Sequence, residues 1–195
     1  MSLNRKIIII GGYCATGKST FAAVLSKKFG VSHFCKDDVK IALNRSIAVN
    51  NRADSRILSA TAFDAMAFTA ERLMETGLPL ILEANFVMRP NHNGLHEGNA
   101  LRDLISRHGY KSLTYIFHGD LEVLYRRFAA RDVLPERGVA NKMWGNFTFD
   151  DYVQANLHLT DLDVGGCVVK IDTTDFASVD FEGYTRIAHE FLNIL

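Results

Sequence analysis

Apolar and polar positions follow two patterns along this chain, and each pattern predicts a kind of element. Short uninterrupted apolar runs, such as residues 6–11, are typical of strands buried on both faces of a parallel sheet. Longer stretches with apolar side chains at helical spacing, such as residues 17–29, predict helices, and Gly30 would end this one. The same patterns predict further strands at residues 32–36, 78–83, 113–117 and 167–171, and further helices at 54–76, 99–108, 121–132 and 179–195.

This alternation of strands and helices predicts an α/β fold with a central parallel sheet and helices on both faces. Ligands of such folds bind at the carboxyl ends of the strands. No internal repeat, low-complexity tract or proline-rich linker divides the 195 residues, so we expect a single domain over residues 1–195. Residues 133–159 show no clear period and are expected to form a less regular insertion.

A complete phosphate-binding motif lies between the first strand and the first helix. Glycines in this motif let successive backbone N–H groups converge on phosphate oxygens, and the helix that begins near Lys18 adds its positive dipole end. Lys18 should reach the β- and γ-phosphates, and the Ser19 hydroxyl should bind Mg²⁺. The expected nucleotide-binding residues are Gly12, Tyr13, Cys14, Ala15, Thr16, Gly17, Lys18, Ser19 and Thr20.

Further segments occur in an order that resembles the P-loop kinase group. They are residues 34–40 after the second strand, 80–86 at the third, 124–131 on a basic helix and 171–174 after the last strand. Together with the P-loop they are similar to the small-molecule kinase-like branch, which includes zeta-toxin-like, chloramphenicol-phosphotransferase-like and polynucleotide-kinase-like domains. The resemblance spans nearly the whole chain. It implies the three-layer P-loop fold of nucleoside and shikimate kinases, with five parallel strands and a helical lid at about residues 126–150.

The resemblance also implies an activity: transfer of the γ-phosphate of Mg·ATP to a hydroxyl of a small molecule. In such kinases a carboxylate just past the second strand orients or deprotonates the acceptor hydroxyl, and Asp37 fits that position best. Its neighbour Asp38 is the alternative base or a substrate-binding group, and either could instead cap a helix beginning near Val39. Glu83 ends a buried strand where it could hold Mg²⁺ through water or contact the acceptor.

Arginines are the expected partners of the transferred phosphate. Arg127 and Arg131 are four residues apart on one helix, so they share a face, and in the kinase group such arginines belong to the lid that closes over the phosphates. A solvated basic face is the alternative. Arg89 follows the third strand and could bind the acceptor or a phosphate. The aromatic residues Phe147 and Tyr152 could stack on a ligand or form a small core of their own.

The composition of the chain limits the kinds of binding partner that we expect. The 22 basic side chains balance 22 acidic ones, so no basic excess indicates nucleic-acid binding. No apolar run approaches the roughly 20 residues that span a bilayer, and no signal-peptide pattern is present, so we expect a cytoplasmic monomer or homodimer. The three scattered cysteines do not indicate a disulfide framework. A nucleotide-binding regulator or toxin-like module with little kinase activity remains the alternative function.

The P-loop lysine provides the first test. Lys18→Ala should lower turnover of ATP at least about 10-fold, because the ammonium group stabilises charge on the phosphates during transfer. The measurement is the steady-state rate of ADP formation. Wild-type ATP use by this variant would mean that the nucleotide site lies elsewhere.

Overall fold

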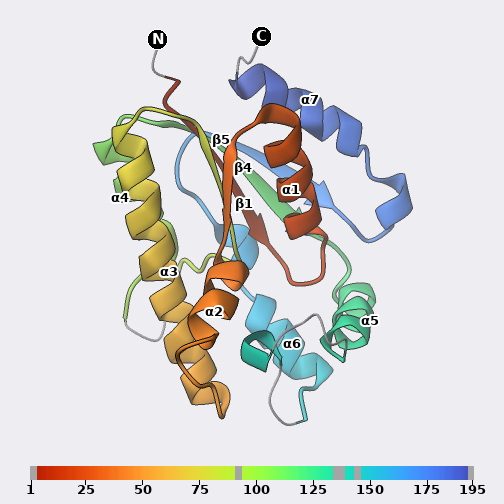
Figure 1. Ribbon diagram of the computed structural model, residues 1–195. Coiled ribbons are helices and arrows are strands. Elements are labelled where there is room, and N and C mark those ends of the chain that lie inside the picture. The colour runs from red at the N-terminus through yellow and green to blue at the C-terminus, as the bar shows by residue number, and fades with distance from the viewer. Residues whose placement is uncertain (1–3, 91–93, 134–138, 143–145, 193–195) are drawn as a thin grey trace.

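The computed structural model describes residues 4–90, 94–133, 139–142 and 146–192. Its centre is a five-stranded sheet in which every pair of neighbouring strands is parallel, in the order β2-β3-β1-β4-β5 (Figure 1). The predicted α/β fold with a parallel sheet is therefore confirmed. The strands are β1 (Lys6–Gly12), β2 (Ser32–Cys35), β3 (Leu80–Glu83), β4 (Lys111–His118) and β5 (Cys167–Asp172).

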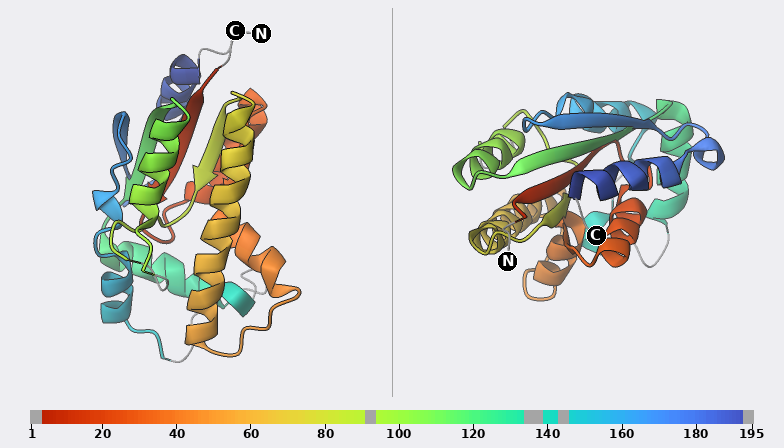
Figure 2. Two further views of the ribbon diagram at one scale, coloured as in Figure 1. Left: turned by 90° about the vertical axis from the view of Figure 1, so that its left-hand side faces the viewer. Right: turned by 90° about the horizontal axis from the view of Figure 1, so that it is seen from above.

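Helices cover both faces of the sheet (Figures 1 and 2). Helices α1 and α7 pack on one face and α3 and α4 on the other, while α2, α5 and α6 gather at the carboxyl ends of the strands. The helices are α1 (Lys18–Phe29), α2 (Lys36–Asn44), α3 (Arg52–Glu75), α4 (Glu97–Arg107), α5 (Leu121–Asp132), α6 (Phe149–Asn156) and α7 (Phe181–Leu192), with short 3₁₀ turns η2 (Val139–Asn141), η3 (Leu159–Asp161) and η4 (Phe176–Ser178).

The central strand β1 explains why the sheet needs two helical layers. Its successive isoleucines are all fully buried, and they alternate between two separate cores. Ile7 and Ile9 pack with apolar side chains of α3 and α4, whereas Ile8 and Ile10 pack with those of α1 and α7. An apolar run without alternation therefore marks the strand whose two faces are both covered, as the sequence predicts.

Two local predictions differ from the structure. Helix α2 begins at Lys36, three residues before the expected start, so the segment that follows β2 turns into a helix at once. Within the expected irregular insertion, α6 is a regular helix with a capping box, in which the Thr148 hydroxyl and the Asp151 carboxylate each accept a hydrogen bond from the other's backbone N–H. The spacing of these two residues is a sequence signal for a helix start that outweighs the weak apolar period.

The two ends of the described chain lie at the opposite end of the sheet from the P-loop (Figure 1). The side-chain amide of Asn4 donates a hydrogen bond of 2.8 Å to the carbonyl of Leu192, which joins the first strand to the last helix. No helix in the described ranges combines the length and the apolar character needed to cross a bilayer.

Gly12 marks the closest approach between the two central strands at their carboxyl ends. It has φ of 111°, and a Cβ placed on it would lie 2.0 Å from the carbonyl oxygen of Phe117. The next residue, Tyr13, donates its N–H to that same carbonyl at 2.8 Å. The start of the P-loop is thus fixed against β4 by a contact that only glycine allows.

Replacing this glycine tests the contact. Gly12→Ala should lower the free energy of unfolding by at least about 3 kcal/mol, since both the backbone conformation and the space exclude a methyl group. Gly30→Ala is the matched control, because Gly30 also has positive φ but meets nothing within 4 Å, and it should cost only about 1 kcal/mol. Urea denaturation measures both, and equal losses would show that the approach to Phe117 is unimportant.

Candidate active site

The P-loop curls around the start of α1, and two of its residues after Gly12 have positive φ. Gly17 has φ of 85°, and the non-glycine residue Ala15 has φ of 61°, which is uncommon for a side chain with a Cβ. Lys18 reaches back across the loop and donates its Nζ to the carbonyl of Tyr13. Helix α1 begins at Lys18, as predicted, so its free N–H groups point into the loop.

A small cavity of about 80 Å³ lies inside this curl. Its wall includes the whole segment 14–20, so all of the expected nucleotide-binding residues except the first two border it. Lys18 is buried there, and burial lowers the pKa of its ammonium group, although nearby acidic side chains, Glu83 and Asp37 among them, act in the opposite direction. Because little water surrounds the Lys18 ammonium group, an anionic ligand that binds it gains a strong electrostatic interaction.

Four side chains from other elements complete the wall of this cavity. Asp37 comes from the first turn of α2, Glu83 from the end of β3, Asn85 from the loop that follows, and Arg131 from the last turn of α5. The structure therefore brings three of the sequence-predicted site residues, Asp37, Glu83 and Arg131, to the P-loop. Asn85 donates its Nδ2 to the sulfur of Cys14 at 2.9 Å.

Glu83 is the buried acid of the site. It is 4% exposed, and its Oε2 has no hydrogen-bond partner among the described residues. The neighbouring Cys35 thiol donates a hydrogen bond to its carboxylate, and burial together with this carboxylate raises the pKa of the thiol. An unpartnered carboxylate oxygen that lines the same cavity as Ser19 fits the oxygen ligands that Mg²⁺ takes, with waters completing its shell. No group of three or more His, Cys, Asp and Glu side chains in the described ranges forms a metal cage.

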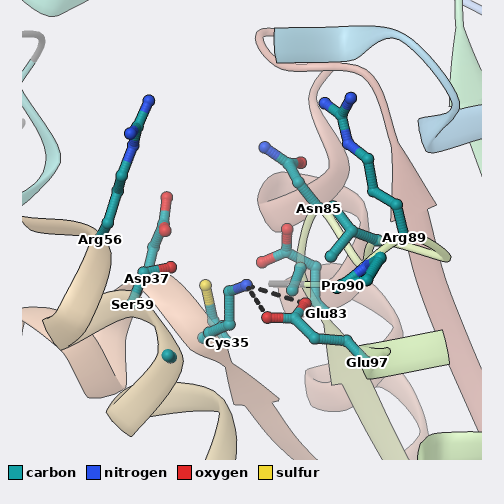
Figure 3. Close-up of a pocket in the computed structure, with 13 residues that line it drawn as sticks. Cys35, Asp37, Arg56, Ser59, Glu83, Asn85, Arg89, Pro90 and Glu97 are labelled. Atoms are coloured by element: carbon teal, nitrogen blue, oxygen red, sulfur yellow. Dashed lines mark hydrogen bonds and ion pairs between the residues drawn. The ribbon is translucent and has the colours of Figure 1, made fainter. Parts of the chain in front are cut away.

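A second, larger cavity of about 500 Å³ adjoins the P-loop (Figure 3). Asp37, Glu83 and Asn85 line both cavities, so these side chains form a shared wall. The rest of the larger cavity is formed by Cys35, Lys36, Arg56, Ser59, Ala60, Ala84, Val87, Arg89, Pro90 and Glu97. Its volume is within the range of small-molecule sites.

An ion pair that the sequence did not indicate lies at the base of this cavity. Lys36 donates its Nζ to both carboxylate oxygens of Glu97, at 3.0 and 3.1 Å, and both side chains are buried (Figure 3). The two residues are 61 positions apart, and only the fold brings α2 and α4 together. Because each charge is compensated by the other, the pair contributes polar atoms to the cavity without a net charge.

Other predicted residues lie elsewhere. Asp38 borders neither of the two cavities, and the N-cap of α2 is Cys35, so neither aspartate caps this helix. Arg127 does not border the P-loop cavity: its guanidinium donates to the carbonyls of Thr173 and Thr174 at 2.6 and 2.8 Å. Of the predicted lid, residues 134–138 and 143–145 lie outside the described residues.

Helix α6 forms two hydrogen bonds with the backbone of the P-loop. The Cys14 N–H donates to Asn156 Oδ1 at 2.7 Å, and the Cys14 carbonyl accepts from the Tyr152 hydroxyl at 2.7 Å. Tyr152 is fully buried against Phe128 and Tyr125 of α5, so it belongs to a small core and does not present its ring to a ligand. The sequence identified the aromatic residues here but not their link to Cys14.

Comparison with known families supports this geometry. A family model described as an AAA domain, AAA_33, matches residues 7–142, which include the P-loop, Asp37, Glu83 and Arg131. The chain belongs to this family. The predicted resemblance to P-loop kinase-like proteins is confirmed by this match and by similar folds among solved structures. No curated protein matches the sequence.

Three solved structures have folds similar to that of this AAA_33 member. A putative kinase from Chloroflexus aurantiacus is 22% identical with a TM-score of 0.82, and the alignment covers 96% of this chain and 98% of that one. A gluconokinase from Sinorhizobium meliloti is 18% identical, with a TM-score of 0.54 and coverage of 97% and 92%. The APS kinase of Mycobacterium tuberculosis, in complex with AMPPNP and APS, is 15% identical, with a TM-score of 0.53 and coverage of 97% and 98%. The P-loop fold expected from the sequence is thus confirmed.

The contact between α6 and the P-loop is testable. Asn156→Ala should lower the free energy of unfolding by about 1–3 kcal/mol, because the Cys14 N–H loses its acceptor. It should also weaken ATP binding, since a smaller fraction of molecules keeps the loop in the binding conformation. Gln154→Ala, on the exposed side of the same helix, is the control for loss of an amide. Thermal melting and calorimetric titration with Mg·ATP measure the two effects, and unchanged ATP affinity would rule out a positioning role.

Proposed function

We propose that this protein is a kinase that transfers the γ-phosphate of Mg·ATP to a hydroxyl group of a small molecule. The observation that carries the proposal is the wall shared by the two cavities. A phosphate-binding loop lies on one side of Asp37, Glu83 and Asn85, and a cavity of small-molecule size lies on the other. An acceptor in the larger cavity would have its hydroxyl beside a carboxylate and facing the P-loop.

The side chains at this wall suit the transfer of a phosphoryl group. Asp37 would accept the proton of the acceptor hydroxyl as its oxygen bonds to the γ-phosphorus, while the bond from that phosphorus to the β–γ bridging oxygen breaks and ADP leaves. Lys18 and Arg131 would bind the phosphate oxygens on which negative charge is spread during the transfer. Burial of Lys18 strengthens this interaction because little water competes for it.

Mg²⁺ would be held by the hydroxyl of Ser19 and, through water, by Glu83. Bound there, it would neutralise charge on the β- and γ-phosphates. The unpartnered Oε2 of Glu83 supports a ligand at this carboxylate, which borders the P-loop cavity.

The lid arginines have different starting positions. Arg131 already borders the P-loop cavity, so it needs little movement to contact a phosphate. Arg127 would have to leave two backbone carbonyls to do so, and in the present conformation it supports the segment after β5. We propose that Arg131 is the principal arginine that contacts the transferred phosphate. Arg127 would act only in a closed state of the lid, in which contacts with phosphate replace its two bonds to backbone carbonyls.

Structural neighbours support a small-molecule acceptor. One is a gluconokinase and another is an APS kinase crystallised with AMPPNP and APS, and both have this fold over nearly their whole length. The second candidate, a nucleotide-binding regulator without an acceptor, has no comparable support from the larger cavity.

Asp37→Asn distinguishes the two functions. The substitution keeps the shape of the side chain but removes the proton acceptor, so phosphorylation of the acceptor should fall by about 10²–10⁴-fold while ATP affinity stays nearly unchanged. The measurement is transfer of labelled γ-phosphate to nucleosides, sugars, nucleotide sugars and aminoglycoside or phenicol antibiotics, with ATP binding followed separately.

Asp38→Asn is the matched control for this experiment, because Asp38 is the adjacent carboxylate and borders neither cavity. A defect confined to Asp38→Asn would move the base assignment by one residue. If wild type phosphorylates none of the compounds and still binds ATP tightly, the regulator becomes the better description.

A further inference from the structure

Two arginines line the larger cavity and do not border the P-loop cavity. Arg56 projects from α3 and Arg89 from the loop after β3, and Figure 3 shows their side chains extending in the same direction on opposite sides of Asn85. They come from elements on different sides of the cavity. A molecule between them would be contacted from both walls.

When the charged side chains that line the two cavities are taken together, Arg56 and Arg89 are the two without an opposite charge to balance them among the described residues. Lys36 and Glu97 neutralise each other, while Asp37 and Glu83 border the P-loop cavity that also holds Lys18 and Arg131. Arg56 forms no hydrogen bond or ion pair with any described residue. Arg89 has one hydrogen bond, of 3.3 Å, to the carbonyl of Gln154.

Such a pair of arginines is suited to one kind of group. A guanidinium presents planar pairs of N–H donors that match two oxygens of a carboxylate, sulfate or phosphate. Two of them that form no ion pair with a described carboxylate create a local positive potential, which attracts anions and offers no benefit to a neutral alcohol. An anion at this position would leave the rest of the molecule directed inward, toward Asp37.

We propose that the acceptor is an anion, whose carboxylate, sulfate or phosphate group binds between Arg56 and Arg89 while its hydroxyl lies at Asp37. This inference rests on the proposed kinase function and specifies the chemical class of its substrate. Arg56 and Arg89 are the residues that determine specificity, and Lys36 and Glu97 contact the polar groups between the two ends of the acceptor.

The experiment compares matched compounds that differ in charge. With the nucleotide site filled by Mg·AMPPNP, the protein is titrated with D-gluconate and its neutral counterpart D-glucitol, and with glucose 6-phosphate and glucose 6-sulfate against D-glucose. At least one anionic compound should bind at least about 10-fold more tightly than its neutral counterpart, as expected for charge-assisted hydrogen bonds. The three anionic compounds distinguish a carboxylate, a phosphate and a sulfate.

Variants assign the effect to the arginines. Arg56→Gln and Arg89→Gln should each raise the Kd of the anionic compound at least about 10-fold and leave the Kd of AMPPNP unchanged. Arg45→Gln, an exposed arginine at the end of α2 that borders neither cavity, should change nothing. Melting temperatures of all variants show that they are folded.

The outcomes separate this inference from the kinase proposal. Any one of three results would overturn the proposal of an anionic acceptor. These are equal binding of neutral and anionic compounds, no binding of any anionic compound, and wild-type binding by both arginine variants. Labelled phosphate transfer to a neutral compound at the same time would leave the kinase function intact. Anion binding that depends on both arginines, without transfer of phosphate to the bound compound, would instead support this site and count against the kinase function.

Discussion

The parallel pairing of β3 with strands on both its sides is the constraint on which the site depends. Glu83 pairs with Ile10 of β1 and with Cys35 of β2, so β2 and β3 end at the same level and β1 continues two residues further, to Gly12. The P-loop begins two residues after Ile10, and α2 begins immediately after Cys35. Because the register fixes these distances along the strands, it sets Lys18, Asp37 and Glu83 around one cavity.

This common edge is reinforced by side chains from distant parts of the chain. Tyr152 and Asn156 form hydrogen bonds with the backbone of Cys14, although they are 138 and 142 residues away from it in sequence. On the other side, Lys40 of α2 donates to the Ser55 hydroxyl of α3, which donates to the carbonyl of Ala140 in η2. The segments that follow α5 therefore contact both the P-loop and the helices that border the larger cavity. A displacement of these segments would be transmitted to both cavities together.

The predictable part of this molecule is the part encoded by local patterns. The apolar run of β1 and the glycines of the P-loop are properties of a few consecutive residues, and the structure has both where the sequence predicts them. Strand order and register, by contrast, give Asp37 and Glu83 their common location, and the sequence suggested it only through its resemblance to P-loop kinases. The start of α2 was misplaced by three residues because the aspartates look like caps when the end of β2 is not known.

The site residues that the sequence did not predict owe their positions to contacts between elements that are distant in sequence. The Lys36 and Glu97 pair and the position of Arg56 beside the cavity follow from how α2, α3 and α4 pack, which no spacing reports. Arg127 and Arg131 show a different limit. Four residues along a helix bring two side chains to one face but also separate them by about 6 Å along its axis, which is enough for one to reach the segment after β5 and the other the P-loop.

The bond between Asn4 and Leu192 has a practical consequence, because it places the first strand and the last helix side by side at the end of the sheet remote from both cavities. A linker of a few residues could join the two ends, and new ends could then be opened in a surface turn, since circular permutation succeeds where termini are close and exposed. For the same reason the molecule can be attached to a solid support through either end with its binding face turned to the solution. Extra sequence added at this end of the sheet would be separated by the length of the strands from any molecule that enters the P-loop.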